Sequence, residues 1–563
     1  MIRISSIPHI YRNVKRWTEI ISVLSKFGLA DWIARLDLEF VKDQLKARDG
    51  EIIARESREA RIRLALTALG PTFIKLGQLL STRPDIVGTT LANELTELQS
   101  NVSADPPQRI RALIESELGQ PIEQLFTTFD DVPIASASIG QVHQATLPST
   151  QRVVVKVQHP GIESIVREDL EVLHGLAQLA VRIPELAAYR PVETVAEMGR
   201  TLRRELDFGR EERNLQQFAA QFAENPWIRI PRPITELCTG RVLTMEMIDG
   251  VKLSNPERLR ATGLDLEEIA RRGAELYLEM IFSNGYYHAD PHPGNILLLP
   301  GNVIGLLDFG MVGRIEERLR ESIEEILLSI VNQDVVMLTS LIKRIGTPPP
   351  GLNEGALSVD VADFVGHYST QALDRFDLSG ALNEMIEIIY RYRISLPPQV
   401  GTLIKTLVTL EGTAKQLHPR FSLMEVMQPF QRKMMWQRLS PARQVRKIRR
   451  VYYELEQLAE ILPRRFREIL DQIQSGKFDV HLDHRGLGPS INRLVLAMMA
   501  SSLFLGSSLM LSQQVPPLLF ANMTVLGLHK ISILGATGCF VSAILGLRLL
   551  RAIGKSGHLD RRE

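Results

Sequence analysis

The stretch His288-Ala289-Asp290-Pro291-His292-Pro293-Gly294-Asn295, followed by Asp308-Phe309-Gly310, decides how this 563-residue chain folds. Asp290 and Asn295 place a carboxylate and an amide oxygen about five residues apart around one turn. The twelve residues between Asn295 and Asp308 read ILLLPGNVIGLL, two strand-like runs around Pro-Gly-Asn, which predict a short hairpin. Carboxylate and amide oxygens are ligands that Mg²⁺ prefers, so the two stretches predict a metal and phosphate site.

The spacing of these residues is that of a protein-kinase catalytic loop, H-x-D-x-x-x-x-N, followed by a metal-binding DFG. Phosphoryl transfer needs metal ions and a positive side chain on the phosphates, and a carboxylate near the acceptor. DFG alone occurs by chance, and a single HxD is usually structural. Both at kinase spacing favour a kinase-like site.

A lysine and a loop of small residues upstream fit the same site. Val153-Val154-Val155-Lys156 ends a β-branched strand in a lysine, as in the motif that contacts nucleotide phosphates. The alternative is an exposed strand lysine. Residues 135–143 (ASASIGQVH) stand where a kinase carries a glycine-rich loop. Their small side chains let backbone N–H groups approach phosphates, although each Cβ restricts positive φ, so nucleotide selectivity or phosphate placement is expected to differ.

An acidic residue from a helix should pair with Lys156. The run Glu205, Asp207 and Glu211 offers three candidates, and a solvated helix face is the alternative interpretation. His143, His159 and His292 have no metal-ligand spacing, so hydrogen-bonded loop or strand roles are expected for them.

Composition excludes several classes of protein. Lys plus Arg (66) nearly equals Asp plus Glu (65), so overall charge gives no case for a nucleic-acid partner. Cys238 and Cys539 are too few for a disulfide framework and are expected to be small buried side chains. With 45% hydrophobic residues the chain can form one large or two ordinary domains. No haem, flavin or non-haem-iron pattern supports a hydroxylase.

Hydrophobic periodicity predicts an α+β protein. Expected helices cover 10–70, ending at Gly70-Pro71, then a helix after Pro71, and 108–126, 161–222 and 265–284, with a helix-rich region from the DFG to about 470 and a loop at 347–351. Expected strands lie in 137–147, 152–160 and 241–248.

The C-terminal region is different in kind. No charged residue occurs from Leu494 to Leu528 or from Ile531 to Leu547, which predicts two membrane spans at 491–512 and 530–550. Flanking cations place both ends in the cytoplasm by the positive-inside rule. A buried helical hairpin of a soluble protein is the alternative. Gly535 and Gly538 are a weak signal for close packing of the two helices.

A basic stretch, 428–450, carries eight Lys or Arg and no acid. It is a candidate for contact with an anionic membrane surface, and a solvated helix face is the alternative. The N-terminus has no secretory signal pattern, and its early acids Glu19 and Asp31 disfavour a transit peptide. We expect a two-pass protein of the bacterial cytoplasmic (inner) membrane, with its kinase-like domain in the cytoplasm.

With these motifs the chain resembles the UbiB family of atypical kinases, the aarF-domain proteins linked to ubiquinone biosynthesis. Lys75-Leu76-Gly77-Gln78 is similar to the family's KxGQ signature, Ala135–Val142 to its alanine-rich loop, and Glu205-Leu206-Asp207 to its ExD motif. The motifs span roughly residues 60–330. Ordinary protein kinases have neither the KxGQ extension nor the alanine-rich loop, so the combination is specific.

The resemblance implies an atypical protein-kinase-like bilobal fold with an N-terminal helical extension and a C-terminal transmembrane hairpin. The expected domains are a KxGQ-bearing helical extension (1–107), an N-lobe with inserted helices (108–250), a C-lobe (251–425), a basic juxtamembrane region (426–489) and two transmembrane helices (490–551).

The resemblance also implies roles for individual residues. ATP is expected to contact Lys156, paired with Glu211, and the loop Ile134, Ala135, Ser136, Ala137, Ser138, Ile139, Gly140, Gln141 and Val142. Asn295 and Asp308 are expected to hold Mg²⁺, with Asp290 as catalytic base. Lys75, Gly77, Gln78, Glu205 and Asp207 form the regulatory set, in which Lys75 meets Glu205 and the KxGQ segment covers the site where a peptide would lie.

Three functions remain open at this point. The first is an ATPase or small-molecule kinase that supports isoprenoid-quinone biosynthesis at the membrane. The second is a nucleotide-gated, lipid-binding scaffold with little or no turnover. The third, a kinase acting on other proteins, is disfavoured by the KxGQ segment. Expected partners are ATP, a membrane lipid or isoprenoid-quinone precursor, other quinone-biosynthesis enzymes and a second copy of the chain, but not nucleic acid. Because Ala289 replaces the arginine of HRD, control through a phosphorylated activation loop is not expected.

Overall fold

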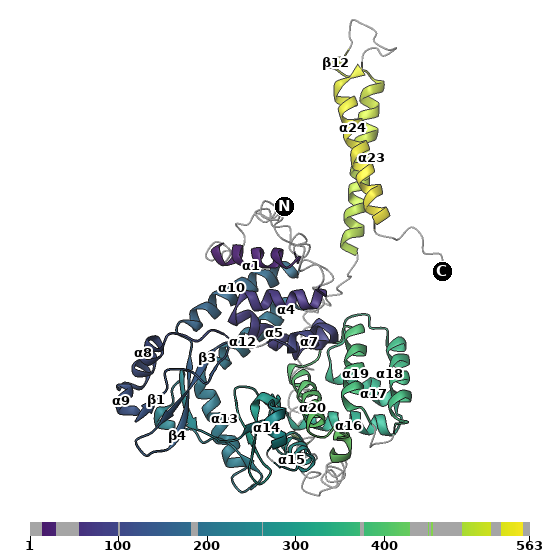
Figure 1. Cartoon of the computed structure of the whole chain (residues 1–563). Coiled ribbons are helices and arrows are strands. Elements are labelled where there is room, and N and C mark those ends of the chain that lie inside the picture. The colour runs from purple at the N-terminus through teal and green to yellow at the C-terminus, as the bar shows by residue number, and fades with distance from the viewer. Residues whose placement is uncertain are drawn as a thin grey trace. The chain divides into compact units, whose positions relative to one another are not determined.

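The structure is a computed structural model that describes residues 14–29, 56–98, 102–181, 190–261, 263–371, 376–427, 487–519 and 531–555, with Arg449, Tyr452, Tyr453 and Glu456. The chain divides into two compact units, Met1–Ser440 and Pro441–Glu563. The first contains every kinase motif and the second contains the apolar C-terminal helices (Figure 1). Except for Arg449, the basic stretch 428–450 lies outside the described residues.

The N-lobe is built on an antiparallel sheet. Its strands are β1 (Thr128–Phe129), β2 (Ala135–Ser136), β3 (Gly140–Thr146), β4 (Arg152–Gln158) and β6 (Val242–Glu246), in the order β1-β3-β4-β6 with β2 paired to β3. Alternation along β4 buries Val153, Val155 and Val157 on one face and turns Lys156 to the other. The strands predicted in 137–147, 152–160 and 241–248 are confirmed.

The buried face of this sheet is covered by α8 (Pro107–Leu118) and α9 (Ile122–Leu125). Ile110 and Ile114 of α8 belong to the same apolar cluster as the β4 valines. The prediction of a single helix over 108–126 is wrong. Gly119 takes a left-handed conformation with φ 72° at the end of α8, and Pro121 precedes the next turn, so the chain breaks between them.

Three long helices are inserted between β4 and β6. They are α10 (Ile162–Ala180), α12 (Pro191–Glu205) and α13 (Phe208–Gln221), within the predicted helical region. Asp207 accepts a hydrogen bond from the Gly209 N–H and caps α13, so only Leu206 and Asp207 separate α12 from α13. This tight junction fixes Glu205 and Glu211 on either side of it.

The N-terminal extension packs on α10 and α12. It contains α1 (Val14–Lys26), α4 (Arg58–Leu69), α5 (Pro71–Ser81), α6 (Pro84–Val87) and α7 (Thr89–Thr96). Trp17 and Phe73 are buried against α10 residues such as Leu170 and Leu173 in one apolar cluster. Gly70, at φ 98°, separates α4 from α5 as predicted, and α5 carries the KxGQ residues.

The C-lobe combines a small sheet with a helical layer. β5 (Ile228–Arg229), β7 (Val251–Lys252), β9 (Ile296–Leu299) and β10 (Val303–Leu306) form a sheet in the order β5-β10-β9-β7, and β8 (Tyr286–His288) pairs with β11 (Val312–Arg314). The antiparallel β9–β10 pair is the hairpin predicted between Asn295 and Asp308. Its register brings the two ends of the hairpin, and therefore Asn295 and Asp308, to the same edge.

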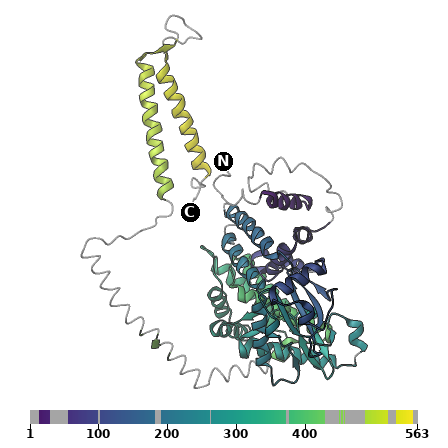
Figure 2. The same cartoon turned by 90° about the vertical axis from the view of Figure 1, so that its left-hand side faces the viewer.

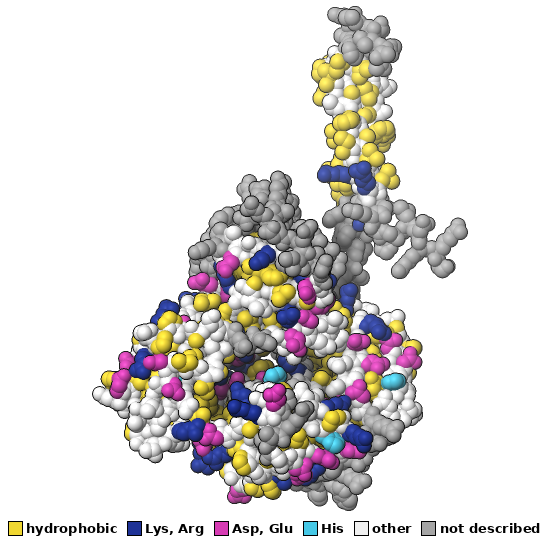
Figure 3. Space-filling view, viewed as in Figure 1, with side chains coloured by type: hydrophobic (Ala, Val, Ile, Leu, Met, Phe, Trp, Pro, Cys, Tyr) yellow, Lys and Arg dark blue, Asp and Glu magenta, His cyan; other side chains and the backbone are white. Residues whose placement is uncertain are grey.

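The C-lobe helices are α14 (Pro256–Ala261), α15 (Leu266–Leu278), η5 (Glu279–Asn284), α16 (Glu317–Val331), α17 (Val335–Ile345), α18 (Glu354–Tyr368), α19 (Leu378–Arg391) and α20 (Pro398–Leu417). The helix predicted over 265–284 ends in the π-helical turn η5. Figure 1 shows the N-lobe strands β1, β3 and β4 on one side of the first unit and the C-lobe helices α16 to α20 on the other, and the space-filling view in Figure 3 shows a hollow between them.

The second unit contains two long helices, α23 (Leu487–Ser512) and α24 (Ile533–Lys555), close to the predicted spans. Figures 1 and 2 show them side by side. A Cβ on Gly535 would lie 2.8 Å from the Ser507 carbonyl oxygen, so glycine permits the close approach that the sequence suggested. Segments 493–512 and 533–551 are long and apolar enough to cross a membrane. Cys539 on α24 and Cys238 in the first unit are both free cysteines. Each is half-buried, whereas the sequence predicted buried side chains.

Two glycine substitutions should have opposite effects on stability. A Cβ on Gly140 would lie 2.3 Å from the Val157 carbonyl oxygen of the paired strand, so Gly140→Ala should force β3 from β4 and cost about 1–3 kcal/mol. Exposed Gly412, inside α20, has open space around it, so Gly412→Ala should stabilise by about 0.5–1 kcal/mol. Denaturant unfolding measures both. Equal effects would contradict the close β3–β4 contact.

Candidate functional site

Lys156, Glu211 and Asp308 meet between the lobes. Lys156 Nζ on β4 lies 2.9 and 2.8 Å from the two carboxylate oxygens of Glu211 on α13, and 3.6 Å from Asp308 Oδ1. Lys156 is largely buried, so the exposed-strand alternative does not hold. Burial alone would lower its pKa, but the Asp308 and Glu211 carboxylates hold the pKa of Lys156 well above its ordinary range. Lys156 is therefore a permanent cation beside the DFG carboxylate.

The DFG segment is held in a defined backbone conformation. Asp308 has φ 55°, an uncommon value for a residue other than glycine. Buried His288 supports it, because His288 Nε2 lies 2.9 and 3.0 Å from the carbonyl oxygens of Leu307 and Asp308. Carbonyls only accept, so Nε2 carries the proton. Asn214 on α13 donates to the Phe309 carbonyl at 2.8 Å, which ties the DFG to the helix that carries Glu211.

The catalytic-loop residues lie as the motif spacing requires. Asn295 Nδ2 donates to Asp290 Oδ2 at 2.9 Å, and the Asp290 N–H donates to His288 Nδ1 at 3.3 Å. Lys156 above all lowers the pKa of the Asp308 carboxyl well below its usual range, so Asp308 is ionised. An ionised carboxylate, with the Asn295 amide oxygen at the same edge, is a donor set that suits Mg²⁺ bound together with phosphate oxygens. The residues present therefore fit the expected metal.

Lys75 comes into the same region from the N-terminal extension. Its Nζ lies 2.7 Å from Glu205 Oε2, and both side chains are largely buried. Burial lowers the pKa of Lys75, while the nearby Asp308 and Asp290 carboxylates act in the opposite direction. Lys75 therefore shares one electrostatic environment with Asp290 and Asp308, and the ion pair with Glu205 joins α5 to α12.

The three acids of the 205–211 run have separate tasks. Glu211 binds Lys156, Glu205 binds Lys75, and Asp207 caps α13 while lying 3.4 Å from Arg213. Burial raises the pKa of the Glu211 carboxyl, and Lys156 opposes that shift. The solvated-face alternative therefore does not hold for Glu205 or Glu211.

The alanine-rich loop forms the turn between β2 and β3. Ala135 pairs with Val142 and Ser136 with Gln141, and the Ala137 N–H donates to the Gly140 carbonyl at 2.9 Å. Ile134 is exposed before the turn, whereas Ser138 and Gln141 are buried and Ile139 packs on two apolar clusters. The turn is therefore closed on itself, with Ala137, Ser138 and Ile139 at its tip.

Three histidines form hydrogen bonds with loops near the site, and one of them, His159, fastens this turn. His159 lies 2.8 Å from the Ala137 carbonyl through Nε2 and 2.6 Å from Asp105 through Nδ1. His143 contacts the Asp130 carbonyl, and His292 accepts from the Gly294 N–H. The expectation that these three histidines are hydrogen-bonded loop or strand residues is confirmed.

Gly77 and Gln78 hold α5 on the segment after α7. Gln78 Nε2 donates to the Leu98 carbonyl at 3.2 Å, and a Cβ on Gly77 would meet the Leu98 side chain at 2.2 Å. Their role in the structure is thus to seat the helix that presents Lys75.

Sequence reasoning missed the residues that α20 contributes. Thr406 donates to the Ala289 carbonyl at 3.1 Å and Thr413 to the Pro291 carbonyl at 3.0 Å, so α20 holds the backbone on both sides of Asp290. Lys405 donates to Ser81 at the end of α5 at 2.8 Å. Burial lowers the pKa of Lys405, and Asp290 opposes that shift. No motif marks these residues, which lie over 100 positions beyond the catalytic loop.

A two-lobed fold with this lysine, glutamate, aspartate and asparagine arrangement, covered by an extra helix, defines an atypical kinase-like protein. Family models match in the same order: the ABC1 atypical kinase-like domain at residues 97–341, the UbiB helical domain at 361–422 and the ABC1/UbiB kinase-like C-terminal domain at 481–555. The chain belongs to the UbiB family, also called the ABC1 family.

The chain is also similar to individual proteins. A Clostridium pasteurianum protein, described by its position in the hydrogenase 1 5′ region, is 31% identical over 97% of this chain and 100% of its own length. A probable protein kinase UbiB from Xanthomonas euvesicatoria is 34% identical over 76% of this chain and 79% of its own. A solved complex of Rv3197 with erythromycin, from Mycobacterium tuberculosis, covers 62% of this chain and 90% of its own at 22% identity and TM-score 0.44.

Breaking the Lys75–Glu205 pair should cost more than breaking an exposed pair. Lys75→Met leaves the Glu205 carboxylate buried without its cation, and we expect a loss of about 3–5 kcal/mol. Glu205→Gln should cost less, because Lys75 keeps Asp308 and Asp290 nearby. The control is Lys343→Met, which breaks an exposed 2.6 Å pair with Glu354 and should cost under about 1 kcal/mol.

Denaturant unfolding of the full chain in detergent measures the coupling, over the complete cycle of Lys75→Met, Glu205→Gln and the Lys75→Met/Glu205→Gln double variant. A coupling energy under about 1 kcal/mol, as expected for an exposed pair, would contradict a buried ion pair between α5 and α12.

Proposed function

We propose that this protein is a membrane-bound atypical kinase or ATPase that uses Mg-ATP in an occluded site and supports ubiquinone, or another isoprenoid quinone, biosynthesis. The observation that carries the proposal is the convergence of Lys156, Glu211 and Asp308 with the hydrogen-bonded pair Asp290 and Asn295. If the only task of these residues were to hold the lobes together, an apolar pair or a neutral hydrogen-bonded pair would do so without the free-energy cost of desolvating charged groups. Their retention in one cluster supports a role in chemistry.

Each residue has a task in the proposed reaction. Lys156 holds the nucleotide phosphates and Glu211 positions Lys156, while Asp308 and Asn295 supply oxygen ligands for Mg²⁺, which when bound neutralises phosphate charge. Asp290 accepts the proton of the acceptor hydroxyl or water as its oxygen bonds to the γ-phosphorus and the bond to the ADP oxygen breaks. His288 and Thr406 keep the loop around Asp290 in place.

The covering helix limits the acceptor. Lys75 on α5 is paired with Glu205, close enough to Asp290 and Asp308 to interact with their charges, and α20 is bonded to α5 through Lys405 and Ser81. An extended peptide would need this helix to move, whereas water or a small molecule would not. This supports a small acceptor. Transfer of radiolabelled phosphate from ATP to a separate purified protein would instead indicate a kinase that acts on proteins.

ATP turnover tests the chemistry directly. Full-length protein in lipid should hydrolyse or transfer the γ-phosphate of ATP, and Asp290→Asn and Asp308→Asn should each lower the rate by about 10²-fold or more. Asp363→Asn, on the exposed side of α18, is the matched control and should leave the rate unchanged. Turnover that survives in both site variants would rule out the mechanism.

The membrane part of the proposal rests on α23 and α24. Both contain a long apolar segment that is only slightly buried, 6% and 11% of its length, which suits lipid contact better than a protein core. Proteins of this family named UbiB support the quinone pathway as the context. A lipid or lipid-pathway client at a membrane is therefore the natural acceptor or ligand.

A deletion strain tests the pathway. We expect it to accumulate one quinone precursor, and the full chain to restore quinone synthesis while a chain ending before α23 does not. Restoration by the shortened chain would contradict the need for a membrane anchor, and unchanged quinones in the deletion strain would remove the pathway assignment while leaving the ATP site intact.

A nucleotide-gated scaffold is the alternative that one observation favours. Lys75, held by Glu205 beside Asp308, leaves the catalytic face covered in this conformation. Quinone synthesis retained with Asp290→Asn but lost without the hairpin would favour this alternative over catalysis.

A further inference from the structure

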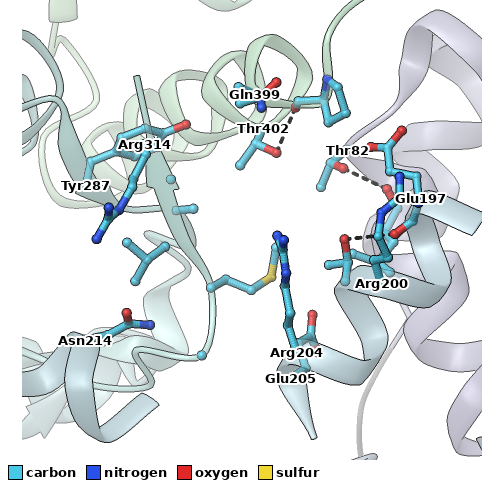
Figure 4. Close-up of a pocket in the computed structure, with 18 of the residues that line it drawn as sticks. Thr82, Glu197, Arg200, Arg204, Glu205, Asn214, Tyr287, Arg314, Gln399 and Thr402 are labelled. Atoms are coloured by element: carbon cyan, nitrogen blue, oxygen red, sulfur yellow. Dashed lines mark hydrogen bonds between the residues drawn. The ribbon is translucent and has the colours of Figure 1, made fainter. Parts of the chain in front are cut away.

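A large cavity lies beside the catalytic loop, between α12, α13, β11 and the start of α20. Its volume is about 1250 Å³. Its lining includes Ala289, which takes the place of the arginine of HRD, together with arginines from several elements. Four of them are Arg200 and Arg204 on α12, Arg210 on α13 and Arg314 on β11. Arg83, which is paired with Asp85, and Arg318 on α16 also line the cavity. Figure 4 shows three of these arginines, Arg200, Arg204 and Arg314.

Several guanidinium groups in the cavity are not paired with a carboxylate among the residues that the structure describes. Arg200, Arg204 and Arg210 are exposed and, within the described part of the chain, make no ion pair with a carboxylate. Arg314 lies over the Tyr286 ring at 5.0 Å and donates weakly to Gln217 at 3.4 Å. In Figure 4 Arg204 extends into the space, with Arg200 on one side and Arg314 on the other.

The acids in the lining do not cancel this charge. Glu205 and Glu211 bind Lys75 and Lys156, Asp207 caps α13, and Glu197 lies 3.7 Å from Arg83. Glu316, exposed at the start of α16, is then a single carboxylate against four arginines. The interior therefore favours an anion. Guanidinium groups bind phosphate oxygens in fork geometry, and three or four of them around one space suit a dianionic tetrahedral group.

Two further features of the lining indicate a ligand. The Tyr287 hydroxyl belongs to a fully buried residue of the wall and has no hydrogen-bond partner, so it is an unused donor. Leu79, Met198, Met311, Val312 and Pro398 give the cavity an apolar part beside its arginines. The occupant should carry both a phosphate and a small apolar body.

We propose that this cavity is an effector site for a phosphate monoester with an apolar group. An anion that joins Arg204 on α12 to Arg314 on β11 would draw the segment after the DFG toward the α12–α13 junction. That junction carries Glu205 and Glu211, the partners of Lys75 and Lys156. Filling the cavity therefore fixes Glu211 on Lys156 and strengthens nucleotide binding. The binding site stands without the proposed catalysis, whereas the effect on nucleotide binding rests on it.

Isothermal titration of the full chain in neutral detergent tests the site, with butyl phosphate as the probe and butanol as its uncharged counterpart. Butyl phosphate should bind and butanol should not. Arg204→Ala and Arg314→Ala should each weaken binding about tenfold or more, and Arg204→Lys should weaken it less. Arg232→Ala, an exposed arginine outside the cavity, should have no effect. Equal affinity in the wild type and both alanine variants, or displacement by a non-hydrolysable ATP analogue, would overturn the proposal.

A second titration tests the coupling. With butyl phosphate present, the affinity for the ATP analogue should rise about fivefold or more, and by reciprocity the analogue should tighten butyl phosphate binding equally. Butyl phosphate that binds without this effect would overturn the effector role. Absence of analogue binding in any condition would instead count against the proposed ATP site. Phosphatidic acid added to the micelles distinguishes a lipid headgroup, which displaces butyl phosphate, from a soluble phosphate ligand, which leaves it bound.

Discussion

The ion pair of Lys156 and Glu211, with Asp308 within 3.6 Å of the lysine, joins three parts of the protein that are far apart in sequence. β4 brings the lysine, α13 the glutamate and the β9–β10 hairpin the DFG aspartate. Lys156 and Glu211 are largely buried and would each be costly to bury alone, whereas the Asp308 side chain is 53% exposed, and the opposite charges compensate one another. The N-lobe sheet, the α12–α13 junction and the catalytic loop must therefore all be in place for the cluster to be stable.

A second charged pair makes this site different from an open kinase cleft. Lys75 and Glu205 join the N-terminal extension to the same junction that positions Glu211, so α5 and Lys156 both depend on neighbouring acids of one short segment. Asp207 caps α13 between them. A movement of α12 against α13 would therefore change the Lys75–Glu205 and Lys156–Glu211 pairs at once.

Helix α20 supports both the catalytic loop and the end of α5. Thr406 and Thr413 hold the backbone around Asp290, and Lys405 joins α20 to the end of α5. A Cβ on Gly401 would lie 2.4 Å from the Thr82 carbonyl oxygen, so the two helices can approach only with glycine there. The helical domain is thus part of the site's framework, although it supplies none of the motif residues.

The sequence alone determined the kinase motifs, the hairpin between Asn295 and Asp308, the strand that ends in Lys156 and the two apolar C-terminal segments, because spacing and periodicity are local properties. It could not choose among Glu205, Asp207 and Glu211 as the partner of Lys156 without the family resemblance, since all three share one short run. It missed the helix break at Gly119. It also missed the part that Lys405 and the threonines of α20 play in the site, and the arginine-lined cavity. Those features depend on how α5, α12, α13 and α20 pack, and only the tertiary structure decides which distant side chains meet.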